Sequence, residues 1–168
     1  MTSPSSASTF NRKLPHNPLK PNASVSTSIP HSLDLQMPNE LPALAGIVQS
    51  VTDLLTQYGA DSAALFAANL ALEELITNII KYGYDDQERH IIHIRAEVRD
   101  HRFELEITDD GHPFNPFEQA PPDTTLSIEE RQIGGLGIHF VRNMLDDCRH
   151  ERRREKNVVI VGKRLQSD

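Results

Sequence analysis

One long amphipathic helix constrains the fold of this chain more than any other segment. Apolar residues recur at helical spacing over residues 65–79, so one face of this helix can be buried. Three polar side chains, Glu74, Asn78 and Lys81, lie beside that face at positions i, i+4 and i+7. The sequence therefore predicts a core helix, ending near residue 82, that shows a row of polar groups along one edge.

This polar row suits chemistry on a phosphate. A carboxamide oxygen such as that of Asn78 can ligate Mg²⁺, and a carboxylate such as that of Glu74 can take a proton from an attacking hydroxyl. A glutamate and an asparagine four residues apart also occur by chance on many amphipathic helices. The pair therefore identifies a site only if other segments of the chain support it.

Composition argues against several classes of protein. The 168 residues carry 17 basic and 24 acidic side chains, and the net charge of −7 argues against a general binder of nucleic acid or anionic membrane. Aromatic residues make up 5%, too few to indicate a surface that stacks single-stranded bases. The single cysteine, Cys148, cannot form an internal disulfide, and no apolar run approaches the roughly 18 residues of a membrane span. We expect a cytoplasmic protein that contacts neither membrane nor nucleic acid directly.

The chain divides into a tail, residues 1–31, and one domain, residues 32–168. The tail is rich in Ser, Thr and Pro without helical or strand periodicity, so we expect it to be disordered. The predicted elements of the domain are a strand at 33–37, a helix at 41–58 with Asn39 as N-cap, the long helix begun by Asp61 or Ser62, strands at 91–98 and 103–107, a helix after 134–137, and strands at 148–154 and 158–165 joined by a turn at 155–157. Such elements favour an α+β two-layer sandwich, a mixed but mostly antiparallel sheet with three helices on one face.

A second candidate polar group, Asp109, follows the end of the predicted strand at 103–107. The carboxylate of Asp109 can point into a cleft there and accept a hydrogen bond from an exocyclic amine, such as N6 of adenine. Gly111 lets the backbone come close to a flat ring. A plain Asp-Gly turn without a ligand is the alternative interpretation.

A third signal is the glycine-rich stretch Gly134-Gly135-Leu136-Gly137. It leads into a helix, whose free N–H groups and positive dipole end can cradle phosphate. No Lys-Ser or Lys-Thr follows, so it is not a Walker A loop. The long polar segment before it, residues 117–133, has the length of a functional lid.

The order and spacing of these segments resemble the Bergerat ATP-binding fold of gyrase B subunits, sensor histidine kinases and mismatch-repair ATPases. Within that fold, the motif sequences are most similar to those of the bacterial anti-sigma factor serine/threonine kinases of partner-switching systems. The resemblance covers about residues 33–165. The stretches that carry it are Glu74–Tyr82, Asp109–Pro116, Gly134–Ile138 and Glu151–Arg153.

The resemblance implies ATP and Mg²⁺ as cofactors and gives the polar residues roles. Glu74 would be the catalytic base or orienting group, Asn78 would ligate Mg²⁺, and Asp109 would hold adenine. A lid of residues 115–133 would cover the triphosphate. The implied nucleotide-binding residues are Asn78, Lys81, Asp109, Gly111, Pro113, Phe114, Gly134, Gly135, Leu136, Gly137 and Ile138. For the arginine run at residues 152–154, a solvated strand end is favoured over a contact with phosphate or a partner.

The function implied is an ATP-dependent kinase that phosphorylates an anti-sigma-factor antagonist on serine or threonine and otherwise holds a sigma factor. The resemblance also favours a homodimer. The alternatives are an ATP-dependent module that sequesters a partner without phosphate transfer and a simple ATPase. A histidine kinase is disfavoured, because no helical dimerisation segment with a phospho-accepting histidine precedes the domain.

Overall fold

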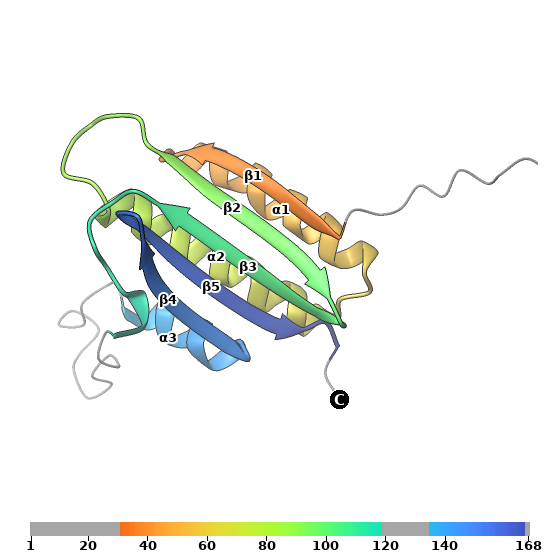
Figure 1. Cartoon of the computed structure of the whole chain (residues 1–168). Coiled ribbons are helices and arrows are strands. Elements are labelled where there is room, and N and C mark those ends of the chain that lie inside the picture. The colour runs from red at the N-terminus through yellow and green to blue at the C-terminus, as the bar shows by residue number, and fades with distance from the viewer. Residues whose placement is uncertain (1–30, 119–134, 167–168) are drawn as a thin grey trace, which may run out of the picture.

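The computed structural model of the chain describes residues 31–118 and 135–166 (Figure 1). The predicted tail, apart from its last residue, and residues 119–133 of the predicted lid lie outside these ranges. The elements in chain order are β1 (Ser32–Pro38), α1 (Leu41–Gln57), α2 (Ser62–Tyr82), β2 (Ile91–Arg99), β3 (Arg102–Asp109), a 3₁₀ turn η1 (Pro116–Glu118), α3 (Gly135–Met144), β4 (Asp147–Arg153) and β5 (Lys156–Arg164).

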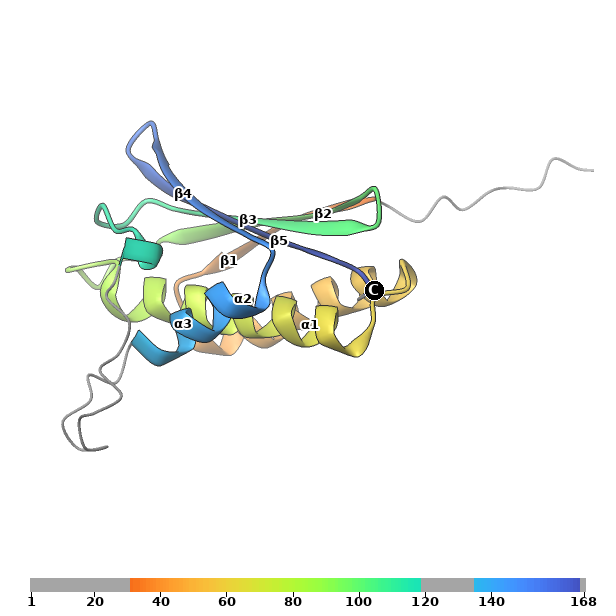
Figure 2. The ribbon, with the colours of Figure 1, turned by 90° about the horizontal axis from the view of Figure 1, so that it is seen from below.

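The five strands form one sheet in the order β1-β2-β3-β5-β4, and each neighbouring pair is antiparallel. Figure 2 shows this sheet as one layer and the three helices as a second layer on one of its faces. The predicted α+β two-layer sandwich is therefore confirmed, with antiparallel pairing throughout the described strands. The β2–β3 hairpin turns at Asp100 and His101, and the β4–β5 hairpin at Arg154 and Glu155, all four with positive φ.

Helix α2 is the centre of the core and packs on both α1 and α3. Seven of its residues are buried, four of them alanines, which lets the neighbouring helices and the sheet come close. On the sheet, alternate residues of β2 (Ile92, Ile94, Ala96 and Val98) point toward the helices. Among the described helices, α2 also has the length and apolar composition of a membrane span, which the sequence had not indicated. Here the seven buried residues of α2 pack within the domain, whereas Phe66 of the same helix stays exposed.

The start of α2 is as predicted, whereas the start of α1 is not. The side chain of Asp61 accepts a hydrogen bond from the backbone N–H of Ala64 at 2.7 Å, a normal N-cap. The N-cap of α1 is Glu40, without a side-chain bond, so the prediction of Asn39 was wrong. Asn39 instead accepts from the backbone N–H of His90 at 3.1 Å. A tertiary contact with the entry of β2 has taken the place of the local cap.

The outer face of the sheet carries ion pairs between strands. Arg153 pairs with Glu106, and Arg149 pairs with Glu104, each at 3.1 Å. Beneath these long side chains, Ile160 of β5 keeps only 5% of its surface exposed. This face is therefore covered by charge, and the pocket described next opens at the helical side of the sheet.

Candidate functional site

A cavity of about 130 Å³ lies between the last turns of α2 and the adjoining ends of β3 and β5. A single water needs roughly 10–15 Å³ on this measure, so the cavity has room for a ring-sized group. Its lining residues are Leu75, Asn78, Ile79, Tyr82, Gly83, Asp109, His112, Pro113, Phe114, Pro116, Asn157 and Val159. Four of the predicted site residues, Asn78, Asp109, Pro113 and Phe114, are therefore brought together in one pocket.

Asp109 is the buried carboxylate of the pocket, with 3% of its surface exposed. Its Oδ1 accepts hydrogen bonds from the backbone N–H of Gly111 and from Nδ2 of Asn157, both at 2.9 Å. Because both bonds fall on Oδ1, the second oxygen can serve a ligand. Burial raises the pKa of Asp109, and the bonds from Asn157 and Gly111 oppose that rise because they favour the ionised form.

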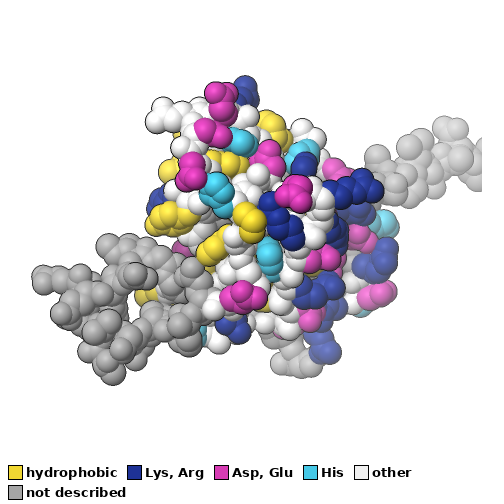
Figure 3. Space-filling model, turned by 60° about the vertical axis from the view of Figure 1, so that its left-hand side comes forward, with side chains coloured by type: hydrophobic (Ala, Val, Ile, Leu, Met, Phe, Trp, Pro, Cys, Tyr) yellow, Lys and Arg dark blue, Asp and Glu magenta, His cyan; other side chains and the backbone are white. Residues whose placement is uncertain are grey.

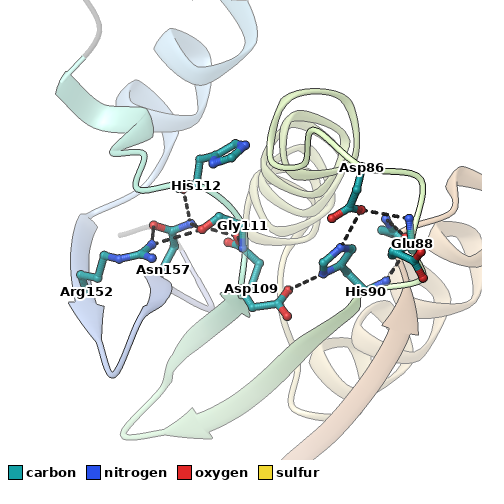
Figure 4. A network of polar contacts seen from close by, with 10 residues as sticks. Asp86, Glu88, His90, Asp109, Gly111, His112, Arg152 and Asn157 are labelled. Atoms are coloured by element: carbon teal, nitrogen blue, oxygen red, sulfur yellow. Dashed lines mark hydrogen bonds and ion pairs between the residues drawn. The ribbon is translucent and has the colours of Figure 1, made fainter.

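Asn157 of β5 organises the polar side of the pocket. It stands opposite Asp109 in the β3–β5 register and is 4% exposed. Besides Asp109, its Nδ2 donates to the carbonyl of His112 at 2.8 Å (Figure 4). Its Oδ1 accepts from the backbone N–H of Phe114 at 3.2 Å. One carboxamide thus fixes both Asp109 and the segment that carries Pro113 and Phe114 into the pocket.

Arg152 supports this arrangement from β4. Its Nη1 donates to Oδ1 of Asn157 at 2.9 Å and to the carbonyl of Gly111 at 3.2 Å. The favoured interpretation of the arginine run, a solvated strand end, agrees with the exposure of Arg152 near the end of β4, but it did not include these contacts with Asn157 and Gly111. It fits Arg153, whose ion pairs lie on the outer face of the sheet.

The end of α2 and the turn after β3 touch through their backbones. The N–H of His112 donates to the carbonyl of Gly83 at 2.9 Å. A Cβ on Gly111 would lie 2.6 Å from the same carbonyl oxygen, too close for any residue but glycine without a shift. Gly111 therefore permits the close approach that sets Asn78, on α2, beside Asp109. Gly111 itself is absent from the cavity lining.

Glu74 lies one turn before Asn78 and faces α3. A Cβ on Gly137 would overlap its carboxylate, so the backbone of the first turn of α3 lies directly against Glu74. Gly135 begins α3, as the glycine-rich stretch predicted, and the side chain of Leu136 is exposed. The side chain of Ile138 packs in the core, which leaves only its backbone to meet a ligand. Gly134 lies outside the described residues.

The metal assignment rests on Asn78 alone. In the described ranges no three His, Cys, Asp or Glu side chains gather so as to hold a metal ion. Mg²⁺ keeps waters and phosphate oxygens and needs few protein ligands, so Asn78 stays the one predicted protein ligand. Lys81 is exposed in the last turn of α2 and absent from the cavity lining, so its assignment stays a prediction.

Exposed aromatic side chains stand at the opening of the pocket. Tyr82 keeps 64% and Phe114 45% of its surface exposed, although both line the cavity. Figure 3 shows this end of the molecule, where apolar, acidic and histidine side chains intermingle. Such rings lose exposed apolar surface when a flat ligand enters.

Sequence reasoning missed several lining residues, above all Asn157, which it placed in a turn. A signal was present, because Asn157 is the polar residue directly before an apolar run, residues 158–161. Tyr82 and His112 stood next to predicted site residues, but no pattern distinguished them.

Residues 37–163 match the family model of the histidine kinase-like ATPase domain. The chain belongs to this family. The prediction from the resemblance is therefore confirmed at the level of the family.

Relatives agree with that assignment. The serine-protein kinase RsbW of Bacillus velezensis is 24% identical over 131 residues, which cover 74% of this chain and 80% of the relative. The anti-sigma F factor of Clostridium novyi is 28% identical over 98 residues, covering 58% and 68%. The crystal structure of the RsbU and RsbW domains of a Mycobacterium tuberculosis protein has a TM-score of 0.57 at 15% identity and covers 82% of this chain and 33% of that one. At this identity, the similarity to the Mycobacterium tuberculosis structure supports the fold alone.

Proposed function

We propose that this chain is an ATP-dependent serine/threonine kinase that acts as an anti-sigma regulatory factor and phosphorylates an antagonist protein. The observation that carries the proposal is one pocket that brings together a buried acceptor, Asp109, and Asn78 of the polar row of α2. One turn before Asn78, Glu74 of the same row lies against the first turn of α3.

Adenine would occupy the end at Asp109. Oδ1 of Asp109 already accepts two hydrogen bonds, so Oδ2 would accept one from the exocyclic amine of adenine. A guanine has a carbonyl oxygen where adenine has N6, so two acceptors would face each other and the wrong base would be rejected. Tyr82 and Phe114 would cover the ring at the opening.

The triphosphate would extend toward α3. The first turn of a helix offers unpaired N–H groups and a positive dipole end, and the backbone of Gly137 reaches Glu74 without an intervening side chain. Asn78 would hold Mg²⁺ together with phosphate oxygens. The ion, when bound, would neutralise charge on the phosphates.

Glu74 would act as the base or orient the nucleophile. A serine or threonine hydroxyl of the partner would attack the γ-phosphorus, the bond between that phosphorus and the bridging oxygen would break, and ADP would leave. The proton of the hydroxyl would pass to the Glu74 carboxylate. Positioning and charge neutralisation supply most of the catalysis in this reaction class, so this small set of groups suffices.

The partners follow from the relatives' names rather than from the geometry. Proteins named serine-protein kinase and anti-sigma factor support a sigma factor and its antagonist as partners. A homodimer, a cytoplasmic location and a domain at residues 32–168 preceded by a separate tail belong to the same proposal. The alternative, a module that only sequesters its partner, gives Glu74 no chemical role.

The test of the nucleotide site is calorimetric titration of the unmutated chain with ATP and with GTP, each with and without Mg²⁺. We expect ATP to bind at least about tenfold more tightly than GTP, the selectivity of one hydrogen bond to a charged acceptor. Equal affinity for the two nucleotides would overturn the assignment of Asp109.

A further inference from the structure

His90 makes a pair of contacts that only one of its protonation states allows. Its Nδ1 lies 3.1 Å from Oδ1 of Asp110. Its Nε2 lies 3.0 Å from Oδ1 of Asp86 (Figure 4). An ionised carboxylate only accepts hydrogen bonds, and a neutral imidazole carries a single N–H. Both contacts can therefore be hydrogen bonds to ionised carboxylates only when the ring is an imidazolium.

The surroundings of His90 favour this charged form. The ring stacks on Tyr84 at a centroid distance of 4.0 Å and an interplanar angle of 17°. The hydrogen bond with Asp86 raises the pKa of His90 most, desolvation opposes it, and the bond with Asp110 adds to the rise. Farther out, Asp109 acts electrostatically on Tyr84, the ring stacked on His90, and the exposed His112 acts on Asp86.

These contacts join two segments that both border the pocket. Residues 83–90 form the connector from α2 to β2, and residues 110–112 form the turn that follows Asp109, the last residue of β3. His90 bonds to Asp86 within the connector and to Asp110 within the turn. Near the other end of the connector, Asp85 pairs with His112 at 2.9 Å, but both side chains there are more than half exposed.

We propose that the imidazolium of His90 is a positioning residue for the adenine site, holding Asp110 so that Asp109 and Gly111 keep their place against the end of α2. This inference rests on the proposed function, since it assumes that adenine binds at Asp109. Without the proton, one of the two bonds must be lost, and the turn is held less firmly. Nucleotide affinity then depends on the protonation of His90.

The direction of the pH dependence follows from the raised pKa. Both hydrogen bonds of the His90 imidazolium, to Asp86 and to Asp110, are fully formed below the ordinary histidine pKa of about 6.5. One of them is lost as the pH rises through the higher pKa that His90 has in the folded protein. ATP should therefore bind more tightly on the acidic side. Linkage is reciprocal, so bound nucleotide should raise the pKa of His90.

The experiment measures ATP affinity by calorimetry from about pH 6 to about pH 9, the range in which a perturbed histidine titrates. It compares the unmutated chain with His90→Gln, which is neutral, and with His90→Arg, which is planar and always charged. His93→Gln, on the outer face of β2, is the matched control. Ionisation of ATP itself is common to all four proteins, so it cancels in the comparison.

We expect the affinity of the unmutated chain to fall about fivefold more across this range than that of His90→Arg, the upper end for a partly exposed ion pair. His90→Gln should bind about fivefold more weakly at the acidic end and lack this extra fall, and His93→Gln should follow the unmutated chain. Nuclear magnetic resonance of the His90 ring in the unmutated protein should show its pKa rising on ATP addition.

Two results would overturn the inference alone: ATP binding whose pH dependence is the same in the unmutated chain and His90→Arg, or a His90 pKa that ATP leaves unchanged. Failure of the unmutated chain to bind ATP at every pH would instead contradict the proposed function, and the inference with it. The ring titration needs no variant, so a variant that fails to fold leaves the inference open to refutation.

Discussion

The carboxylate of Glu74 lies directly against the backbone of Gly137, with no space for a side chain between α2 and the first turn of α3. This contact joins the polar row of α2 to the helix start that we assign to phosphate binding. It makes glycine at 137 a steric requirement, in a helix where alanine would otherwise be preferred.

Gly137→Ala should impair the site without unfolding the protein. The added methyl group forces Glu74 or α3 to move, at a cost of about 1–3 kcal/mol, and we expect ATP affinity to fall about tenfold. Gly46→Ala is the matched control, because a Cβ there meets nothing within 4 Å. That substitution should raise the free energy of unfolding by about 0.5–1 kcal/mol and leave ATP binding unchanged. Equal ATP affinity in the two variants would contradict the assigned role of this contact.

Asn157→Ala should cost both stability and binding. It removes one of the two hydrogen bonds that Asp109 accepts, together with the bonds to the carbonyl of His112 and from the backbone N–H of Phe114, so we expect the free energy of unfolding to drop by about 2–3 kcal/mol. The control is Asn69→Ala, which removes a 3.0 Å bond from Thr52 between α1 and α2, far from the pocket. Denaturant unfolding and ATP titration of both variants decide the matter. Unchanged ATP affinity in Asn157→Ala would show that Asp109 needs no support.

Asp109→Asn should separate stability from binding. Its Oδ1 can still accept from Gly111 and Asn157, while the buried charge is gone. Because burial raises the pKa of Asp109, the ionised form opposes folding above that pKa, so the variant should be at least as stable as the unmutated chain at neutral pH. This advantage should fade as the pH falls through the pKa of Asp109, where the unmutated carboxyl is neutral too.

The same Asp109→Asn variant should bind ATP about 10- to 100-fold more weakly, the worth of a hydrogen bond to a charged acceptor. Thermal unfolding across pH and calorimetry with ATP measure the two effects. A variant that is clearly less stable at neutral pH, or one that binds ATP as before, would contradict this account of the carboxylate.

Asn78→Ala should remove the dependence of ATP binding on Mg²⁺, whereas Asn78→Asp keeps a ligating oxygen and should retain it. Titrations with and without Mg²⁺ give the answer directly. If Asn78→Ala still binds ATP more tightly with Mg²⁺, the ion is held by other groups.

Much of the fold was predictable because periodicity and turn chemistry act locally. The 3.6-residue pattern located α2, and Asp61 marked its start, since a capping aspartate bonds within its own first turn. Asn39 looked equally suitable as a cap. A contact with His90, 51 residues away in the chain, decided otherwise, and no local pattern contains that information.

The site residues that lie on one helix or in one turn could be predicted from the sequence. Those that are brought together only by the pairing of two strands could not. Asp109 stands at a strand end that the sequence marks with an Asp-Gly pair. Its partner Asn157 was assigned to a turn, because the β4–β5 hairpin reverses at Arg154 and Glu155, two non-glycine residues with positive φ. Only the β3–β5 register places Asn157 opposite Asp109.

The measurement that tests the central claim most directly is phosphate transfer by the unmutated chain and by Glu74→Gln. Each is incubated with γ-labelled ATP, Mg²⁺ and the antagonist partner, and the label is located by mass spectrometry. We predict label on a serine or threonine of the partner and a roughly 10²–10⁴-fold slower transfer by Glu74→Gln, with ATP and partner binding retained, because the change removes only the charge of the base. An unmutated chain that binds ATP and partner but transfers nothing would contradict the kinase and leave the sequestering module.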